Sequence, residues 1–421
     1  MSLTGFISNR LSLRGDGGRK WPPAICVAVG GISVSFIVMM LSIAVVKGFK
    51  EEIKRKIMGF DAQISVMSLA SYYGDGNGVV SMDDALAEAV EQALADQDGA
   101  ALSKAEAALS FSQPGIIKTA DDFAGVVFRG YGEGHGWEFE RSVLTEGELP
   151  DGSDQRAITV SESTASRLGL KTGDKVDAYF ITGGDVRPRR FEVKGLYRSN
   201  FGEYDDMIVF ASAEALRKLD RLGENEGHRL EINGLEEQMI YPVAERLQSL
   251  LNRSFAQDRL SQSLAVSTVF SSGAVYFNWL ELLDTNVVVI LLLMGCVSAF
   301  TLISCVIILI LQRVRMVGIL KSLGAGNGLI RNIFIRLGLR VTVTGLLIGN
   351  AVSMAVIWCQ STFRVLPLDP EAYYLSYVPV SVTAADWILL NAGVLVVSFA
   401  VMLVPTGIVS RLSPVKPLRF E

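Results

Sequence analysis

The sequence predicts a membrane protein with four transmembrane helices and a large mixed α/β extracytoplasmic domain, in two lobes, between the first and second helix. The main observation is a set of long runs without any charged residue, at Ile25–Val46, Thr285–Gln312, Val341–Phe363 and Trp387–Ser410. Each run can cross a bilayer, because a helix of ~20 apolar residues spans the ~30 Å hydrocarbon core. A long segment of ordinary soluble composition separates the first run from the other three.

Composition supports this division and excludes one class of partner. The chain is 50% hydrophobic and 20% charged, which is too apolar for an ordinary globular enzyme and too charged for a purely membranous protein. The net charge of −5 provides no basic surplus for phosphates, so nucleic acid is not an expected partner. All four cysteines lie inside the charge-free runs, so the soluble segment contains no disulfide.

Basic residues predict the orientation of the spans. Six basic side chains and no acid lie between Arg313 and Arg340, and the tail after Ser410 is also basic. By the positive-inside rule these segments are cytoplasmic, which puts both termini inside and the large domain outside. The basic cluster from Lys47 to Lys56 contradicts this pattern, although long translocated domains often escape the rule.

These signals divide the chain into nine parts. They are a cytoplasmic interfacial helix (1–23), the first span (24–47), the extracytoplasmic domain with stalk helices (48–283), the second span (284–312), a cytoplasmic helix and loop (313–336), the third span (337–363), an outer loop (364–384), the fourth span (385–410) and a cytoplasmic tail (411–421).

The soluble segment alternates between strand and helix patterns. Strands are predicted at Ala62–Met67, Phe123–Tyr131, Ala157–Val160, Lys175–Ile181, Arg190–Leu196 and Met207–Phe210. Helices are predicted at Met82–Leu94, Glu162–Leu168, Ala213–Leu219 and Leu235–Leu251, the last interrupted by Pro242. We expect two small lobes with a boundary near Gly132–Pro150, where glycine and proline mark loops.

Catalytic and metal-binding patterns are nearly absent from the sequence. The only histidines, His135 and His228, lie in polar stretches without cysteine, so we expect surface-loop histidines and no metal site. No phosphate-binding G-x-x-x-x-G-K-[ST] motif occurs. The adjacent Asp205 and Asp206 are expected on a solvated surface, and no catalytic residue is assigned.

The segment after the second run predicts a short amphipathic helix. Met316, Ile319, Leu320 and Leu323 recur at helical spacing, and Gly324 and Ala325 end the pattern. Such a helix either lies on the membrane surface or docks into a groove of a cytosolic partner.

The residues of this segment resemble a known family. Val314–Ala325 is similar to the coupling helix of FtsX-like, or MacB-type, ABC transporter permeases, which share the order of one span, a large external domain and three spans. Further stretches resemble the lipoprotein-releasing (Lol-type) permeases, namely Val46–Ile53, Ile57–Phe60, Asn278–Asn286, Leu368–Leu375, Val378–Val380 and Ser413–Glu421.

The resemblance implies a function and a set of partners. It implies a bacterial inner-membrane permease without an ATPase site of its own, with a periplasmic domain of a Sabre-like and a Porter-like lobe. Such permeases extract acylated lipoproteins and pass them to a periplasmic carrier for outer-membrane sorting. The implied partners are a dimer of cytosolic ATP-binding subunits, which hold ATP and Mg²⁺, and a second permease, identical or paralogous.

The resemblance also implies three sets of functional residues. ATPase coupling is expected at Arg315, Met316, Gly318, Ile319, Leu320, Lys321, Leu323, Gly324 and Ala325. A cavity for lipoprotein acyl chains is expected at Met40, Leu41, Val45, Phe49, Val287, Ile290, Leu291 and Met294. Contact with the carrier is expected at Arg187, Arg189 and Arg190, in a stretch that a plain hairpin turn explains equally well.

Two other functions remain open at this stage. One is a permease of the same family that exports peptides or drugs. The other is a membrane scaffold that transports nothing, although a scaffold needs no cytosolic coupling helix.

Overall fold

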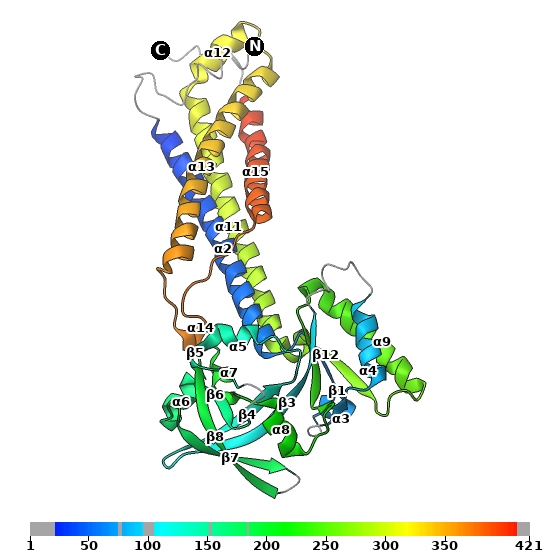
Figure 1. The fold of residues 1–421 in the computed structure, drawn as a ribbon. Helices are drawn as coiled ribbons and strands as arrows, with labels where there is room; N and C mark the ends of the chain where they lie inside the picture. The colour runs from blue at the N-terminus through cyan, green and yellow to red at the C-terminus, as the bar shows by residue number, and fades with distance from the viewer. Residues whose placement is uncertain (1–21, 75–77, 96–104, 151–153, 183–184, 411–421) are drawn as a thin grey trace. The chain divides into compact units, whose positions relative to one another are not determined.

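The computed structural model describes residues 22–410 apart from 75–77, 96–104, 151–153 and 183–184 (Figure 1). Residues 1–21 of the predicted interfacial helix (1–23) and the predicted tail (411–421) lie outside the described residues. The chain divides into a membrane unit, formed by residues up to Glu51, Trp279–Pro367 and residues from Tyr377 onward, and a soluble unit. The soluble unit comprises Glu52–Asn278 and Leu368–Ser376.

The membrane unit contains the four predicted spanning helices, which Figure 1 shows side by side. They are α2 (Pro23–Phe60), α11 (Ala274–Gln312), α13 (Asn327–Phe363) and α15 (Ala384–Ser410). Helices α2 and α11 have 38 and 39 residues, more than the ~20 that a bilayer requires, so each continues beyond its charge-free run as expected. The short helix α12 (Val314–Ser322) precedes α13, which begins ten residues before the predicted third span.

Small residues let α2 pack closely on α13. Gly345 and Gly349 are four residues apart, and a Cβ atom built on them would lie 2.9 Å and 3.0 Å from Ile32 and Phe36. Ser33 Oγ also donates a 2.8 Å hydrogen bond to the carbonyl oxygen of Gly345. Close backbone approach and interhelical hydrogen bonds are the interactions that hold helices together where no hydrophobic effect acts between them.

Gly349→Leu should therefore destabilise the membrane unit. The added side chain overlaps Phe36, which is fully buried, and overpacking of this kind costs about 1–3 kcal/mol. The check is the thermal unfolding of the detergent-solubilised protein. The control is Gly30→Leu, because no described atom lies within 4 Å of an added Cβ at Gly30. Equal melting temperatures for the two variants would contradict this packing.

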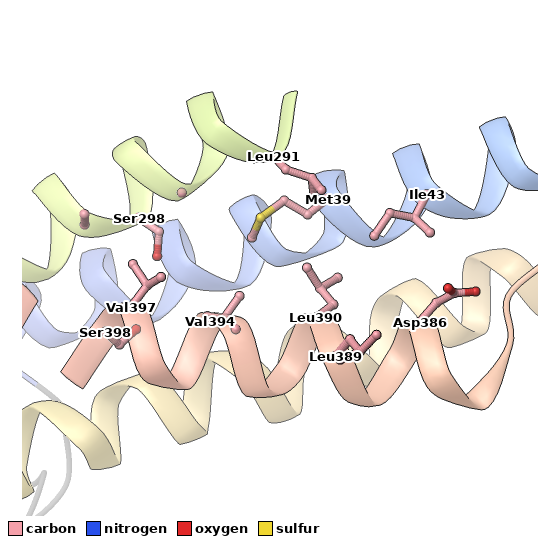
Figure 2. A pocket seen from close by; sticks show the side chains of 13 residues that line it. Met39, Ile43, Leu291, Ser298, Asp386, Leu389, Leu390, Val394, Val397 and Ser398 are labelled. Atoms are coloured by element: carbon pink, nitrogen blue, oxygen red, sulfur yellow. The ribbon is translucent and has the colours of Figure 1, made fainter. Parts of the chain in front are cut away.

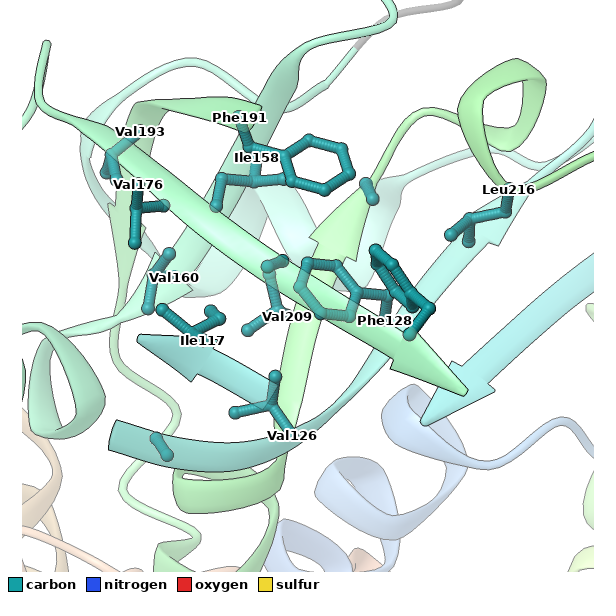
Figure 3. Close-up of a cluster of buried hydrophobic side chains, with 14 of the residues drawn as sticks. Ile117, Val126, Phe128, Ile158, Val160, Val176, Phe191, Val193, Val209 and Leu216 are labelled. Carbon is teal, nitrogen blue, oxygen red and sulfur yellow. The ribbon is translucent and has the colours of Figure 1, made fainter. Parts of the chain in front are cut away.

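One lobe of the soluble unit is a closed six-stranded barrel. Its strands are β3 (Glu106–Lys118), β4 (Phe123–Tyr131), β6 (Ala157–Ser161), β7 (Lys175–Thr182), β8 (Asp185–Tyr197) and β9 (Ile208–Ala211). The ring runs β3-β4-β9-β6-β8-β7 and closes because β7 pairs with both β8 and β3. Phe128, Phe180 and Phe191 fill its interior together with branched aliphatic residues (Figure 3).

The other lobe is a sheet covered by two helices. Strands β12 (Leu264–Thr268), β1 (Ile64–Ser68) and β11 (Arg229–Asn233) pair in this order and join the first half of β3. Helix α9 (Ile240–Ala256) packs on β12 and on α4 (Asp84–Leu94). The carboxylate of Asp83 caps α4 by accepting a 2.8 Å hydrogen bond from the N–H of Leu86.

The remaining elements of the soluble unit are short. The strands are β2 (Val80–Ser81), β5 (Leu144–Gly147) and β10 (Glu226–Gly227). The helices are α3 (Leu69–Tyr72), α5 (Glu138–Val143), α6 (Glu162–Leu168), α7 (Gly202–Met207), α8 (Ala213–Asp220), η1 (Glu237–Met239), α10 (Val269–Ser272) and α14 (Pro370–Tyr373).

The mixed α/β domain with two lobes is confirmed, but the predicted boundary is wrong. The chain passes from the sheet lobe into the barrel along β3 and returns through β11, α9 and β12. A cut at Gly132–Pro150 therefore falls inside the barrel lobe. Pro242 also does not interrupt the predicted helix, because it lies in the first turn of α9, where its missing N–H has no intrahelical partner.

The expected surface position of Asp205 and His228 is also wrong. His228 is buried, its Nδ1 accepts the N–H of Ser112 at 3.0 Å and its Nε2 lies 3.3 Å from Asp220. Asp205 is buried and accepts hydrogen bonds from the hydroxyl and the N–H of Ser199. Burial raises the pKa of Asp205, and the hydrogen bonds from Ser199 oppose that rise.

This raised pKa predicts a pH-dependent stability. Between the unfolded pKa of 3.8 and the higher folded pKa, the folded protein binds more protons than the unfolded chain, so the contribution of Asp205 to stability falls as pH rises. The free energy of unfolding can be measured by denaturant titration of the wild type and Asp205→Asn from pH 3 to 7. The contribution that falls as pH rises should be present in the wild type and absent from Asp205→Asn. Asp206→Asn, at the exposed neighbour, is the control. A constant difference between wild type and Asp205→Asn across this range would refute the assignment.

Candidate functional site

The membrane unit contains an apolar groove of about 460 Å³ between α2, α11 and α15 (Figure 2). Its walls are the side chains of Met39, Ile43, Leu291, Leu389, Leu390, Val394 and Val397. This volume lies within the range of about 300–1,000 Å³ that is usual for ligand pockets.

The groove exists because small residues line the facing helices. Gly295 of α11 and Gly393 of α15 both border it, and an added Cβ at either would meet no described atom within 4 Å. Ser298, Ala299 and Ser398 are the other small lining residues. Larger side chains at these places would close the space between the three helices.

An ion pair lies at one end of the groove. Lys47 Nζ of α2 is 2.6 Å from Oδ2 of Asp386, which lines the groove in the first turn of α15. The hydroxyl of Thr383 also donates to this carboxylate at 2.6 Å and accepts from Lys47 at 3.2 Å. Charged groups in or near a membrane require such partners, and this pair links α2 to α15.

Helix α12 presents apolar side chains at the surface of the membrane unit. Val317 is buried in a cluster with Ile330 and Phe334 of α13, which fixes one face of the helix. Ile319 and Leu323 are 54% and 78% exposed. Gly324 has a φ of +88°, and the N–H groups of Gly324 and Ala325 close the end of the helix on carbonyls within it.

In the barrel lobe, the β7–β8 hairpin carries three arginines in different environments. Arg187 donates a 2.6 Å hydrogen bond to the carbonyl of Leu219. Arg190 forms two hydrogen bonds with Asp177, at 2.7 and 3.0 Å, and they lower the pKa of that carboxyl group. Arg189 is exposed and donates only to the carbonyl of its neighbour Pro188 among the described contacts. Arg189 is therefore the arginine best placed to meet a partner.

A protein-family comparison decides the class of this chain. Residues 288–414 match the family of the FtsX-like permease C-terminal domain. The chain therefore carries a C-terminal domain of the FtsX-like permease type. The matched residues contain α12, α13 and α15 and most of α11, which are the helices that carry the predicted coupling segment and two walls of the groove.

Curated relatives extend the similarity over nearly the whole permease. It is 23% identical over 408 residues to the lipoprotein-releasing system transmembrane protein LolC of Xylella fastidiosa (strain 9a5c), covering 93% of this chain and 92% of that one. LolC of Neisseria meningitidis serogroup B is 23% identical over 416 residues, covering 94% of both chains. The chain is therefore similar to Lol-type permeases over nearly its whole length.

One solved structure aligns with about half of this chain. The extracellular domain of the noncanonic ABC-type transporter YknZ from Gram-positive bacteria aligns with 49% of this chain and 99% of its own, at 16% identity and a TM-score of 0.31. This score is too low to support any inference about the site.

The structure places the predicted acyl-chain residues at different surfaces. Leu291 lines the groove, whereas Met40 packs with Phe36 and Leu346 on the side of α2 that faces α13. Phe49 packs edge-on against Trp279, with ring centroids 5.6 Å apart. The other five residues are half-buried on α2 or α11 and do not line the groove, namely Leu41, Val45, Val287, Ile290 and Met294.

The structure also adds groove residues that the sequence analysis missed. Met39 and Ile43 are neighbours of predicted residues, but the wall on α15 was not considered. A sequence signal existed there, because Asp386 stands alone at the start of an apolar run and Gly393 interrupts that run.

The predicted coupling residues differ in exposure. Arg315, Ile319, Leu323 and Gly324 are exposed and Gly318 is buried, while the rest are half-buried, namely Met316, Leu320, Lys321 and Ala325.

Proposed function

We propose that this permease is the membrane subunit of an ATP-driven complex that extracts lipoproteins from the inner membrane and hands them to a periplasmic carrier. The observation that carries this proposal is the apolar groove between α2, α11 and α15, in a chain that resembles lipoprotein-releasing permeases over 93% of its length. The acyl chains of the lipoprotein would enter this groove. Both termini would face the cytoplasm and the soluble unit the periplasm, as the basic residues predict.

The energetics of extraction require such a groove. At ~0.8 kcal/mol per buried CH₂, removing a multiply acylated anchor from lipid costs tens of kcal/mol. An apolar receiving surface offsets most of this cost, because the chains exchange lipid for protein instead of water. Met39 and the aliphatic walls suit this role, since flexible side chains adapt to chains of different shape.

The conformational change driven by ATP hydrolysis would reach the permease through α12. Ile319 and Leu323 offer apolar anchors, and Arg315 adds charge on the same helix, for a groove in a separate ATP-binding subunit. ATP and Mg²⁺ would bind to that subunit. A second permease, identical or paralogous, would complete the membrane part, and Arg189 of the β7–β8 hairpin would meet an acidic rim of the carrier.

Depletion of the permease in its host tests the function directly. After depletion, inner and outer membranes are separated and mature lipoproteins are quantified in each. Accumulation in the inner membrane is the expected result. Unchanged sorting, in a host without a second copy, would contradict lipoprotein release and favour export of a peptide or drug.

A further inference from the structure

The soluble unit contains a second cavity that the proposed function does not use. It has a volume of about 480 Å³ and borders the last turn of α2, the start of β3 and helix α5. The side chains that matter for its chemistry are Glu106, His135, Trp137, Glu138 and Glu140.

One carboxylate oxygen at this cavity has no hydrogen-bond partner among the described residues. The side chain of Glu140 is only 1% exposed. Its Oε1 lies 3.1 Å from Nε2 of His135, but its Oε2 has no hydrogen-bond partner among the described residues. Buried polar atoms are almost always hydrogen-bonded, and buried charges are almost always paired, so this oxygen points to a missing donor.

Aromatic rings hold the histidine and the wall of the cavity in place. Tyr131 stacks on His135 with centroids 3.8 Å apart, and Trp137 packs edge-on against both rings at 5.2 and 5.1 Å. Trp137 has a φ of +53°, a backbone conformation that is unfavourable for a bulky residue.

The charges around the cavity favour a cation. Glu106, Glu138 and Glu140 supply three carboxylates, and His135 is the only basic side chain that lines it. The nearby Arg129 donates to the carbonyl of Phe60 and lies 3.9 Å from Asp61, so its charge is already engaged. The described His, Cys, Asp and Glu residues do not converge into a metal site. The aromatic rings instead suit an organic cation, because ring faces attract positive charge.

We propose that this cavity binds an organic ammonium group, which donates to Oε2 of Glu140 and rests against Trp137. The ammonium belongs either to a small amine or to a lysine side chain of a partner protein. Its binding would bear on α2, because the ring of Phe139 in α5 packs directly on Gly59, where an added Cβ would overlap it. A ligand bound in the cavity therefore stabilises the contact between α5 and the last turn of α2.

The test is a titration of the full-length protein in nanodiscs with n-butylammonium chloride, followed by tryptophan fluorescence. We expect a saturable change that Trp137→Phe abolishes and that n-butanol or sodium chloride at equal concentration does not produce. Glu140→Gln should weaken binding at least about tenfold, as expected for loss of a charge-assisted hydrogen bond. Glu133→Gln, an exposed acid outside the cavity, should leave binding unchanged.

Several outcomes would overturn the proposal. They are an absent saturable response in the wild type, an equal response to n-butanol, or unchanged affinity in a folded Glu140→Gln variant. Should Glu140→Gln fail to fold, the comparison of butylammonium with butanol on the wild type still decides.

Carbodiimide coupling in native membranes distinguishes the two sources of the ammonium. Incorporation of added n-butylamine at the buried Glu140, seen by mass spectrometry, assigns a small amine. A cross-linked species that disappears in a Glu138→Gln, Glu140→Gln double variant assigns a lysine of a partner. Coupling at neither carboxylate would contradict an ammonium at this site.

Discussion

Gly393→Leu should reduce lipoprotein release at least about tenfold while the protein stays folded and membrane-inserted. Gly393 borders the groove, and no described atom lies within 4 Å of an added Cβ there. A leucine side chain would therefore occupy the groove without overlapping another helix. It would exclude part of the acyl anchor, and a mismatch of about 1.4 to 2.8 kcal/mol corresponds to about ten- to a hundredfold.

Release is measured as transfer of a radiolabelled lipoprotein from proteoliposomes to the purified carrier in the presence of ATP. Gly30→Leu is the matched control, because it adds the same side chain to an open position of α2 outside the groove lining. Undiminished release by a folded Gly393→Leu variant would show that the acyl chains bind elsewhere. Equal loss in both variants would indicate a general effect of bulk in the membrane.

Leu323→Asp should abolish association with the ATP-binding subunit. Leu323 is 78% exposed, at the end of α12, so the aspartate is tolerated in the free permease. In the complex its carboxylate would be buried in an apolar groove without a partner, and this costs several kcal/mol, or more than about a hundredfold in affinity. The result is read by copurification of the ATP-binding subunit with tagged permease from detergent extracts.

Ser322→Asp is the control for this experiment. Ser322 precedes Leu323 directly and is also exposed, but it is polar, so an added charge there removes no apolar anchor. Circular dichroism of both variants checks that the fold is retained. Copurification of an intact complex with Leu323→Asp would exclude α12 as the docking helix.

The two sites differ in how much of them could be predicted from the sequence. The spacing of Ile319 and Leu323 identifies an amphipathic helix, and the structure shows these two residues exposed. The groove was harder to predict, because α2 and α11 are apolar around their whole circumference, and such helices carry no signal of which face points where. The predicted Met40 therefore faces α13, while its neighbour Met39 lines the groove.

The soluble unit shows the same limit in its strands. The prediction of Phe123–Tyr131 coincides with β4, because its side chains alternate in a regular pattern. Strand β3 was missed, and Pro114 within it is a residue that normally breaks strands. In the structure Pro114 pairs with Val127 of β4, and it lies between the part of β3 that pairs with β11 and the part that pairs with β7.

The sequence by itself determined the four spans, their separation by a soluble segment, the short helix after the second span and six of the twelve described strands. These features depend on local composition and periodicity, which act over a few turns or one strand. Only the tertiary structure decided which helix faces meet, that the barrel closes through β7, and that Glu140, His135 and Trp137 share a cavity. Those arrangements depend on contacts between residues far apart in the chain, for which a single sequence holds no periodic signal.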